Sequence, residues 1–165
     1  MACTIRQAEK KDVPRLLDIY NYEVTHGVAT LDLQEKTLAE WEVWFSQHNR
    51  DNHPLFVAEK DGIVMGYVSL SSYREKEAFR TTVELSIYIA PEGRRQGIAS
   101  QLMGFILEKA KTDPAIHTVV SVITSGNEAS TKLHEEFGFT FCGTIKEVGM
   151  KFGKYLDIDN YYLLV

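Results

Sequence analysis

The sequence is poor in cysteine and has no long apolar run. Its two cysteines, Cys3 and Cys142, are too few and too dispersed for a disulfide framework or a cysteine-rich zinc site. No apolar stretch approaches the roughly 20 residues that cross a membrane, and the N-terminus lacks the apolar core of a signal peptide. We therefore expect an intracellular, cytoplasmic protein that associates with no membrane and holds no metal.

An excess of positive charge is also absent. The formal net charge is −5, which disfavours a non-specific nucleic-acid surface. The length of 165 residues and the 44% hydrophobic content are those of a single folded domain with a real core, so we expect one domain over residues 1–165. Against this acidic background, the adjacent pair Arg94 and Arg95 indicates a dedicated anion site.

The stretch 82–102 reads as a strand, a tight basic turn and a helix start. Apolar residues alternate along the strand, and Pro91 ends it. A helical apolar period begins at Ile98. Between them the turn brings Arg94, Arg95 and Gly97 to a helix N-terminus, where free backbone N–H groups and positive charge favour a phosphate or pyrophosphate. The glycine spacing fits neither a dinucleotide-binding fingerprint nor a P-loop.

The remaining elements follow from periodicity and turn signals. Strands are expected over 4–8, 55–59, 63–70, 118–123, 140–147 and 157–165, with a hairpin at 61–62 and a loop around 151–154. Helices are expected after the capping residues Asp12, Thr37 and Asn127, besides the one that follows Gly97. The element order is therefore β-α-α-β-β-β-α-β-α-β-β, a mixed sheet with helices on both faces.

Glu84 is a carboxylate in the middle of an otherwise apolar strand. Because Ser86 and Tyr88 share its face, one interpretation is a polar face turned to solvent. The other is a general base, since an amine acceptor is mostly protonated near neutral pH and must lose a proton to attack a thioester.

Asn127 and His134 form a second group with two interpretations. Asn127 can simply cap the helix that it opens. His134 follows Leu133 at the edge of the apolar stripe, so it can be structural, or it can donate a proton to a leaving thiolate. A thiol that carries the acyl group itself is disfavoured, because Cys142 is expected to be buried beside Phe141. The aromatic stripe of Trp41, Trp44 and Phe45 indicates core or a dimer face.

Several separated motifs resemble one family. Arg94-x-x-Gly97-x-Ala99 resembles the acetyl-CoA pyrophosphate loop of the GNAT acetyltransferase superfamily. Four further stretches are similar to the phosphinothricin N-acetyltransferase group, which includes the acetyltransferases of methionine sulfoximine and methionine sulfone. They are Thr82-Val-Glu84, Asn127 with Ser130, Leu133-His-Glu135, and the run from Lys151 to Asp157.

The resemblance implies a GNAT fold of the α/β (α+β) class, with a mixed, mostly antiparallel, twisted sheet of about seven strands. It implies catalysis by Glu84 as base and His134 as acid, acetyl-CoA as co-substrate, and a homodimer. The implied cofactor-binding residues are Ile87, Tyr88, Ile89, Arg94, Arg95, Gln96, Gly97, Ile98, Ala99, Ser100, Asn127 and Ser130. The implied acceptor-binding residues are Arg74, Lys76, Phe79, Thr30 and Leu31. Leu31 stands where the group commonly has an aromatic residue.

The expected function is transfer of acetyl from acetyl-CoA to the primary amine of a small amino-acid-like acceptor, by direct attack in a ternary complex. A protein, peptide or polyamine acetyltransferase is the alternative within the same class, although Arg74 and Lys76 would repel a polycation. A non-catalytic acyl-CoA sensor is the alternative of another class. The sequence does not identify the physiological acceptor.

Overall fold

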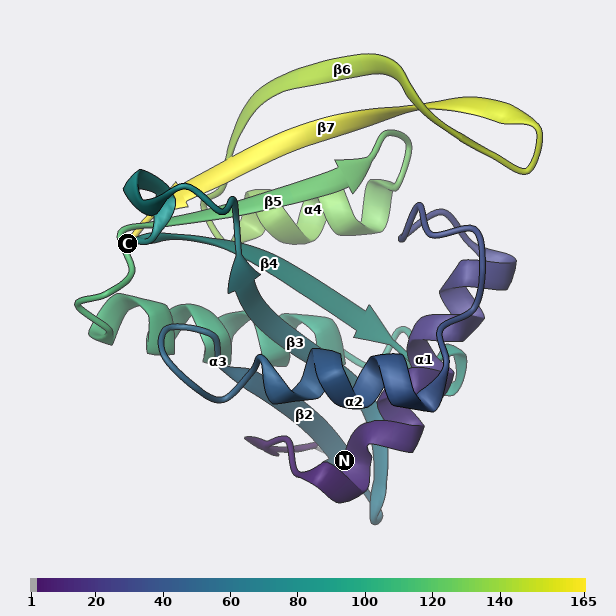
Figure 1. The fold of residues 1–165 in the computed structure, drawn as a ribbon, viewed down its shortest axis with the longest axis vertical. Helices are drawn as coiled ribbons and strands as arrows, with labels where there is room; N and C mark the ends of the chain where they lie inside the picture. Colours follow the sequence, from purple (N-terminus) through teal and green to yellow (C-terminus); the bar gives the residue numbers. More distant parts are fainter. Residues whose placement is uncertain (1–2) are drawn as a thin grey trace.

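The computed structural model describes residues 3–165. Its elements occur in the order expected from the sequence, and three short 3-10 turns lie between them. The strands and helices are β1 (Thr4–Gln7), α1 (Val13–His26), α2 (Leu38–Ser46), β2 (Leu55–Lys60), β3 (Ile63–Ser72), β4 (Thr82–Ile89), α3 (Ile98–Thr112), β5 (Thr118–Thr124), α4 (Glu128–Glu136), β6 (Thr140–Lys151) and β7 (Lys154–Leu164). Figure 1 shows their arrangement.

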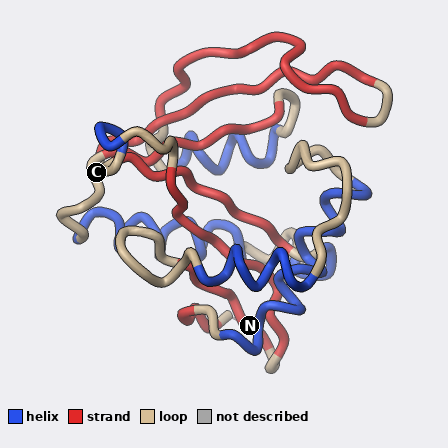
Figure 2. Tube along the Cα trace, viewed as in Figure 1, coloured by secondary structure: helices blue, strands red, loops and turns tan. Residues whose placement is uncertain are grey.

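The strands form one seven-stranded sheet in the order β1-β2-β3-β4-β5-β7-β6. All neighbouring strands are antiparallel except β4 and β5, which run parallel. One core joins α3 to one face of the sheet, and a second core joins α1 and α2 to the other face. The helices and strands can be followed by colour in Figure 2. The expected mixed, mostly antiparallel sheet with helices on both faces is confirmed.

Two tight turns set the lengths of the hairpins. Asp61 and Gly62 both have positive φ, 52° and 78°, which is the geometry that favours Asp-Gly in a two-residue hairpin turn. Phe152 and Gly153 adopt the same kind of turn, with φ of 53° and 73°. The connection expected around 151–154 lies there, but it is a two-residue turn, and the strands on both sides of it are longer than expected. β6 continues to Lys151, beyond the expected end at residue 147. Its pairing with β7 shifts register between Ile145 and Gly149 and then resumes.

The helix starts are specified mostly by single side chains. Thr37 Oγ1 accepts a hydrogen bond from Glu40 N at 3.2 Å, and Asn127 Oδ1 accepts one from Ser130 N at 3.2 Å, so both caps are confirmed. Asp12 precedes α1, but its side chain does not cap that helix. Its carboxylate instead accepts charge-assisted hydrogen bonds from the Arg6 guanidinium and closes the preceding 3-10 turn by accepting from Glu9 N.

The cysteine and tryptophan predictions have different outcomes. Cys142 is exposed on β6 rather than buried, because β6 is the edge strand of the sheet formed by the described residues. Trp41, on α2, is buried in the core between the two N-terminal helices and the sheet. Trp44 and Phe45 pack against that core. Among the described residues, no helix has both the length and the apolar composition to cross a membrane.

Candidate active site

The site is organised around the point where β4 and β5 separate. Thr82, Val83 and Glu84 pair with Thr118–Val120, and the pairing stops there. Beyond Glu84 the two strands diverge, as Figure 1 shows. The edge of β4 that faces β5 is therefore free over 85–89, which includes the expected cofactor-binding positions Ile87, Tyr88 and Ile89. A free strand edge can pair with an extended ligand that carries amide groups.

Glu84 lies at this junction and points to the side of the sheet covered by α1 and α2. It is half-buried, and burial raises the pKa of its carboxyl group, while the positive charge of Arg74 partly opposes the shift. A raised pKa brings a carboxylate closer to the range in which it exchanges protons near neutral pH. Neither carboxylate oxygen of Glu84 is part of an ion pair within 4.0 Å among residues 3–165.

The Glu84 face of β4 is not turned to solvent, because a cavity of about 410 Å³ lies over it. β3 and β4 form its floor, and α1, α2 and the loop between them form its walls. Its lining residues are Tyr20, Thr30, Asp32, Lys36, Trp41, Trp44, Tyr67, Ser69, Glu84, Ser86 and Tyr88. The volume suits a small molecule. The solvent-face interpretation of Ser86 and Tyr88 is thereby replaced by a cavity wall.

One wall of the cavity is held by hydrogen bonds between distant segments. The Tyr20 hydroxyl bonds to the Asp32 carboxylate and lies 2.8 Å from Thr30 Oγ1. Lys151 Nζ, at the end of β6, donates to Thr30 O at 2.8 Å. Thr124 Oγ1, at the end of β5, donates to Val28 O at 2.6 Å. The loop after α1, drawn in tan in Figure 2, is thus fastened to two strands far away in sequence.

The expected acceptor-binding residues are only partly brought together. Thr30 lines the cavity. Leu31 lies against β6, since its Cδ1 would be 2.9 Å from a Cβ at Gly149. Arg74 is exposed and stacks on Tyr73, yet it is close enough to affect Glu84 electrostatically.

Lys76 and Phe79 lie outside the cavity. Both are exposed and belong to the η2 turn region (Glu77–Phe79), where the Phe79 ring contacts Tyr73 edge-on.

The anion loop forms as expected at the start of α3. Gly97 has a φ of 76°, a left-handed conformation that favours glycine, and its carbonyl accepts the first helical hydrogen bond, from Gln101 N at 3.1 Å. The amides of Ile98, Ala99 and Ser100 precede that bond and are available to an anion.

Some side chains of this loop bond to other parts of the protein, and one does not form such a bond within residues 3–165. Arg94 Nη2 donates to Glu23 Oε1 of α1 at 2.5 Å. The Gln96 side-chain amide makes two hydrogen bonds of 2.8 Å. Its Oε1 accepts from Lys60 Nζ, and its Nε2 donates to Glu92 O. Arg95 is exposed and has positive φ, and it takes part in none of the ion pairs found within 4.0 Å over residues 3–165. Arg95 is therefore the side chain that can reach an incoming anion at least cost.

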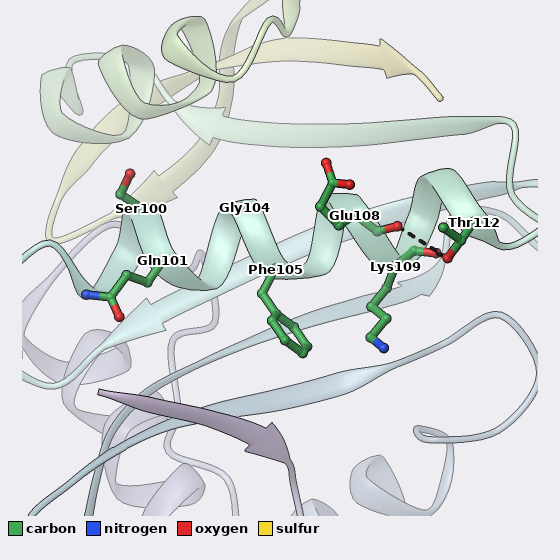
Figure 3. Close-up of a pocket in the computed structure, with 7 residues that line it drawn as sticks. All are labelled: Ser100, Gln101, Gly104, Phe105, Glu108, Lys109 and Thr112. Carbon is green, nitrogen blue, oxygen red and sulfur yellow. Dashed lines mark hydrogen bonds between the residues drawn. The ribbon is translucent and has the colours of Figure 1, made fainter. Parts of the chain in front are cut away.

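A second, shallower hollow of about 580 Å³ runs along the exposed side of α3. Figure 3 shows Gln101, Phe105 and Lys109 pointing to one side of the helix and Ser100 and Glu108 pointing to the other. It is lined by one helix alone, so no group from another element converges with these side chains on a bound molecule. Its only link with the site is Ser100, at the start of α3.

His134 lies on the opposite face of the sheet from Glu84. It was expected at the edge of a buried stripe, but it is 1% exposed and is the buried residue of α4. Its ring packs against Phe139 and Tyr161, which belong to the core on the α3 side. Of the apolar stripe expected on this helix, Leu133 and Phe137 are half-buried and Ala129 is exposed, because α4 is short and covers the sheet near its edge.

Both ring nitrogens of His134 have partners. Nδ1 lies 2.7 Å from Ser130 O, and Nε2 lies 2.7 Å from Ser121 Oγ on β5. Burial lowers the pKa of the imidazole, so the neutral ring predominates. A neutral ring that donates from Nδ1 to a carbonyl must accept at Nε2, from the Ser121 hydroxyl. Ser121 directly follows the last β5 residue paired with β4, so it lies where the strands part.

Most lining residues of the cavity were missed by sequence reasoning. Tyr20, Asp32 and Lys36 come from α1 and a loop without periodicity, and Trp41 and Trp44 read as core. Ser69 offered a usable signal, because it interrupts an apolar strand. In the described part of the chain, no three His, Cys, Asp or Glu side chains gather in a way that could hold a metal ion.

Comparison with known proteins agrees with this geometry. The family model described as Acetyltransferase (GNAT) family matches residues 16–139. The chain is 38% identical over 159 residues to an L-methionine sulfoximine/L-methionine sulfone acetyltransferase of Pseudomonas paraeruginosa, covering 96% of this chain and 92% of that protein.

Two solved structures are similar over nearly the whole chain. A phosphinothricin acetyltransferase from Sinorhizobium meliloti in complex with acetyl-CoA has a TM-score of 0.95 at 31% identity, covering 100% of this chain and 89% of that one. A structure described as ribosomal-protein-alanine N-acetyltransferase from Brucella melitensis has a TM-score of 0.94 at 38% identity, covering 98% and 99%. The chain belongs to the GNAT family of acetyltransferases.

Proposed function

We propose that this enzyme transfers acetyl from acetyl-CoA to the primary amine of a small amino-acid-like acceptor, of the methionine sulfone, methionine sulfoximine or phosphinothricin type. The observation that carries the proposal is the position of Glu84. It lies where β4 and β5 part, and it faces a cavity of about 410 Å³ that opens to solvent. The names of the similar proteins from Pseudomonas and Sinorhizobium support this acceptor class.

The residues present fit acetyl-CoA. The free edge of β4 at Ile87, Tyr88 and Ile89 can pair with the amides of the pantetheine arm. The helix start and the exposed guanidinium suit its pyrophosphate. A Cβ at Gly97 would meet nothing within 4 Å, so the backbone there is open to a ligand. We assign pyrophosphate binding to Arg94, Arg95, Gln96, Gly97, Ile98, Ala99 and Ser100, and contact with the arm to Asn127 and Ser130.

Acetyl-CoA supplies the acyl group when it is bound, and Glu84 prepares the amine. An α-ammonium group that enters the cavity meets the Glu84 carboxylate, which takes its proton directly or through a water molecule. The free amine then attacks the thioester carbonyl at the point where the strands part. Backbone N–H groups of β4 that face the gap can stabilise the negative charge that develops on the carbonyl oxygen.

His134 supplies a proton to the leaving thiolate from the face of the sheet opposite Glu84. Because the ring is buried and bonded to Ser121, it delivers a proton through the Ser121 hydroxyl, from Nε2 of its imidazolium form. Burial makes that form a minor species at neutral pH, so this proton transfer contributes less than the one at Glu84.

Arg74 is our assignment for the acceptor's carboxylate, because its charge acts on the Glu84 end of the cavity. Thr30 is part of the cavity wall. Lys76, Phe79 and Leu31 lie farther out, and we assign them to the rim of the acceptor site.

We further propose a homodimer that works in the cytoplasm. Exposed apolar side chains along the β6–β7 hairpin and its turn support the dimer, and the intracellular supply of acetyl-CoA supports the location. The exposed residues are Phe141, Ile145, Val148, Met150, Phe152 and Tyr155.

The test is release of free thiol from acetyl-CoA across a panel of acceptors. The panel contains methionine sulfone, methionine sulfoximine, phosphinothricin, ordinary amino acids, spermidine and peptides with an N-terminal alanine. Saturable turnover confined to the small amino-acid analogues is expected. Turnover only with peptides or spermidine would replace this acceptor class, and acetyl-CoA binding without any turnover would indicate a sensor.

A further inference from the structure

Two side chains that line the cavity each carry a buried hydrogen-bond donor for which no partner is found over residues 3–165. Trp41 and Tyr67 both line the cavity that contains Glu84, and they are 5% and 1% exposed. Over residues 3–165, Trp41 Nε1 and the Tyr67 hydroxyl are the buried side-chain polar atoms for which no hydrogen bond is found. Buried polar groups are rarely left unpaired, and an unpaired donor in a ligand-sized cavity indicates a ligand that accepts from it.

The aromatic rings around the cavity pack against one another, and Tyr20 is the one whose polar group bonds to other described side chains. The Tyr67 ring packs against Tyr88 and Trp44, with centroids 5.5 and 5.8 Å apart. The Trp41 ring packs against Tyr20 at 4.4 Å. The Tyr20 hydroxyl, in contrast, already bonds to Thr30 and Asp32.

The chemistry of the two groups limits what they can bind. An indole N–H only donates. Burial and the neighbouring Tyr88 and Tyr20 hydroxyls raise the pKa of Tyr67 well above its ordinary value, so its hydroxyl also remains a neutral donor. Among the lining residues that the structure describes, only Lys36 is cationic. A pair of neutral donors suits an uncharged oxygen better than a carboxylate, which would need a counter-charge when buried.

The position of Tyr67 relative to Glu84 fits the far end of an amino acid. Across β3 and β4, Ser71 pairs with Glu84, Ser69 with Ser86, and Tyr67 with Tyr88. Glu84 and Tyr67 therefore lie at opposite ends of the cavity floor, and the short side chains of Ser69 and Ser86 lie between them. An acceptor whose amine lies at Glu84 extends its side chain along this floor toward the unpaired donors.

We propose that Trp41 N–H and Tyr67 O–H bind the sulfur-bound oxygen of the acceptor and make the enzyme select oxidised methionine analogues over methionine itself. This inference rests on the small-acceptor function proposed above. Methionine has a similar shape but no such oxygen, so it would leave both donors unpaired. Sites built to hydrogen-bond a ligand oxygen discriminate strongly against analogues that lack it.

Intrinsic fluorescence can test this proposal, because the two tryptophans of the chain, Trp41 and Trp44, both line the cavity. Methionine sulfone and methionine are titrated into wild type and Tyr67→Phe in the presence of CoA. We expect wild type to bind methionine sulfone at least about tenfold more tightly than methionine. Tyr67→Phe should lose most of this preference because its affinity for the sulfone falls while its affinity for methionine stays the same. Tyr162→Phe, outside the cavity, is the matched control and keeps the preference. Trp41→Phe, read from Trp44, gives the same loss as Tyr67→Phe.

Turnover separates this inference from the proposed function. If wild type acetylates the sulfone and methionine equally well, the selectivity inference fails and the activity stands. If the sulfone binds selectively but no acceptor is acetylated, the proposed function fails and the inference stands. Equal weakening of both ligands in Tyr67→Phe would indicate a packing role, and an unchanged preference or no binding to wild type would overturn the inference directly.

Discussion

Glu84 is the residue on which the proposed chemistry depends most. Glu84→Gln keeps the size of the side chain and removes its ability to take a proton. We expect kcat to fall about a hundredfold or more, the usual contribution of a positioned base, with little change in the Kd for acetyl-CoA. Steady-state kinetics and equilibrium binding of acetyl-CoA measure the two quantities. Unchanged turnover across the pH range would exclude Glu84 as the base.

The charge of Arg74 contributes to the pH at which Glu84 loses its proton. Burial raises the pKa of Glu84, and Arg74 partly lowers it. A base must be deprotonated, so activity is lost as the pH falls through this pKa. Arg74→Gln removes the lowering charge, so the acidic limb of the kcat/KM profile should move to higher pH. Lys76→Gln is the control, and its limb should coincide with that of wild type. A limb that moves to lower pH in Arg74→Gln would contradict the assigned geometry.

His134 and Ser121 should behave as one unit. Because the His134 ring reaches the junction only through the Ser121 hydroxyl, His134→Asn and Ser121→Ala should each lower kcat by about tenfold, and the double variant should be no worse than His134→Asn. Thermal unfolding of the same variants separates this effect from loss of stability. Additive losses in kcat would show that the two side chains act independently.

Individual site residues could be predicted only where the local sequence carries the signal. Glu84 interrupts an apolar strand, and Gly97 precedes a helix in a basic turn, so the sequence alone singles out both as candidates. The orientation of Arg94 was not, because Glu23 is 71 residues away along the chain and binds it only in the fold. The burial of His134 depends on β5 and β7, which no local pattern could supply.

At the scale of elements, the β6–β7 hairpin positions the acceptor cavity. Lys151, buried at the end of β6, donates to Thr30 O at 2.8 Å and to Glu23 O at 3.3 Å. Lys151→Met fills similar volume but leaves Thr30 O unpaired, which costs about 1–3 kcal/mol, whereas Glu23 O keeps its bond from Gly27 N. We expect a lower unfolding temperature and a severalfold higher KM for the acceptor, with KM for acetyl-CoA unchanged.

Lys154→Met is the matched control for this prediction. Lys154 is exposed on the other side of the Phe152–Gly153 turn, so both kinetic constants should remain those of wild type. If KM for acetyl-CoA rose as much as that for the acceptor in Lys151→Met, the hairpin would support the whole site rather than the acceptor wall.

The order and type of the elements followed from periodicity, whereas the cavity did not. Its walls come from α1, α2 and a loop that all lie before β2 in sequence, and its floor comes from β3 and β4. Sequence patterns distinguish a buried face from an exposed one, but they do not show where two buried faces fail to meet. Trp41 and Trp44 were therefore read as core, although they also line the site.

At the scale of the whole molecule, the sheet ends in an apolar edge. Within residues 3–165, β6 has β7 on one side and no strand on the other, and the β6–β7 hairpin extends beyond the rest of the sheet in Figure 1. Ile145 and Val148 on this strand are 50% and 49% exposed. Long apolar edges aggregate unless they are covered, and contiguous exposed apolar patches mark interaction sites. A second copy of the chain is the partner implied by the family resemblance.

Sedimentation equilibrium tests this assignment. Wild type should sediment at twice the 18.8 kDa mass of the chain, and the double variant Ile145→Lys/Val148→Lys should sediment at the single mass. Charges buried in an apolar interface without partners prevent association. Ile63→Lys replaces an equally exposed residue, 52%, next to the Asp61–Gly62 turn, and it should remain dimeric because that turn lies apart from β6. A dimer that tolerates the β6 charges but not Ile63→Lys would place the interface at the β2–β3 hairpin. Because Lys151 links β6 to the acceptor wall, loss of the dimer should also raise KM for the acceptor.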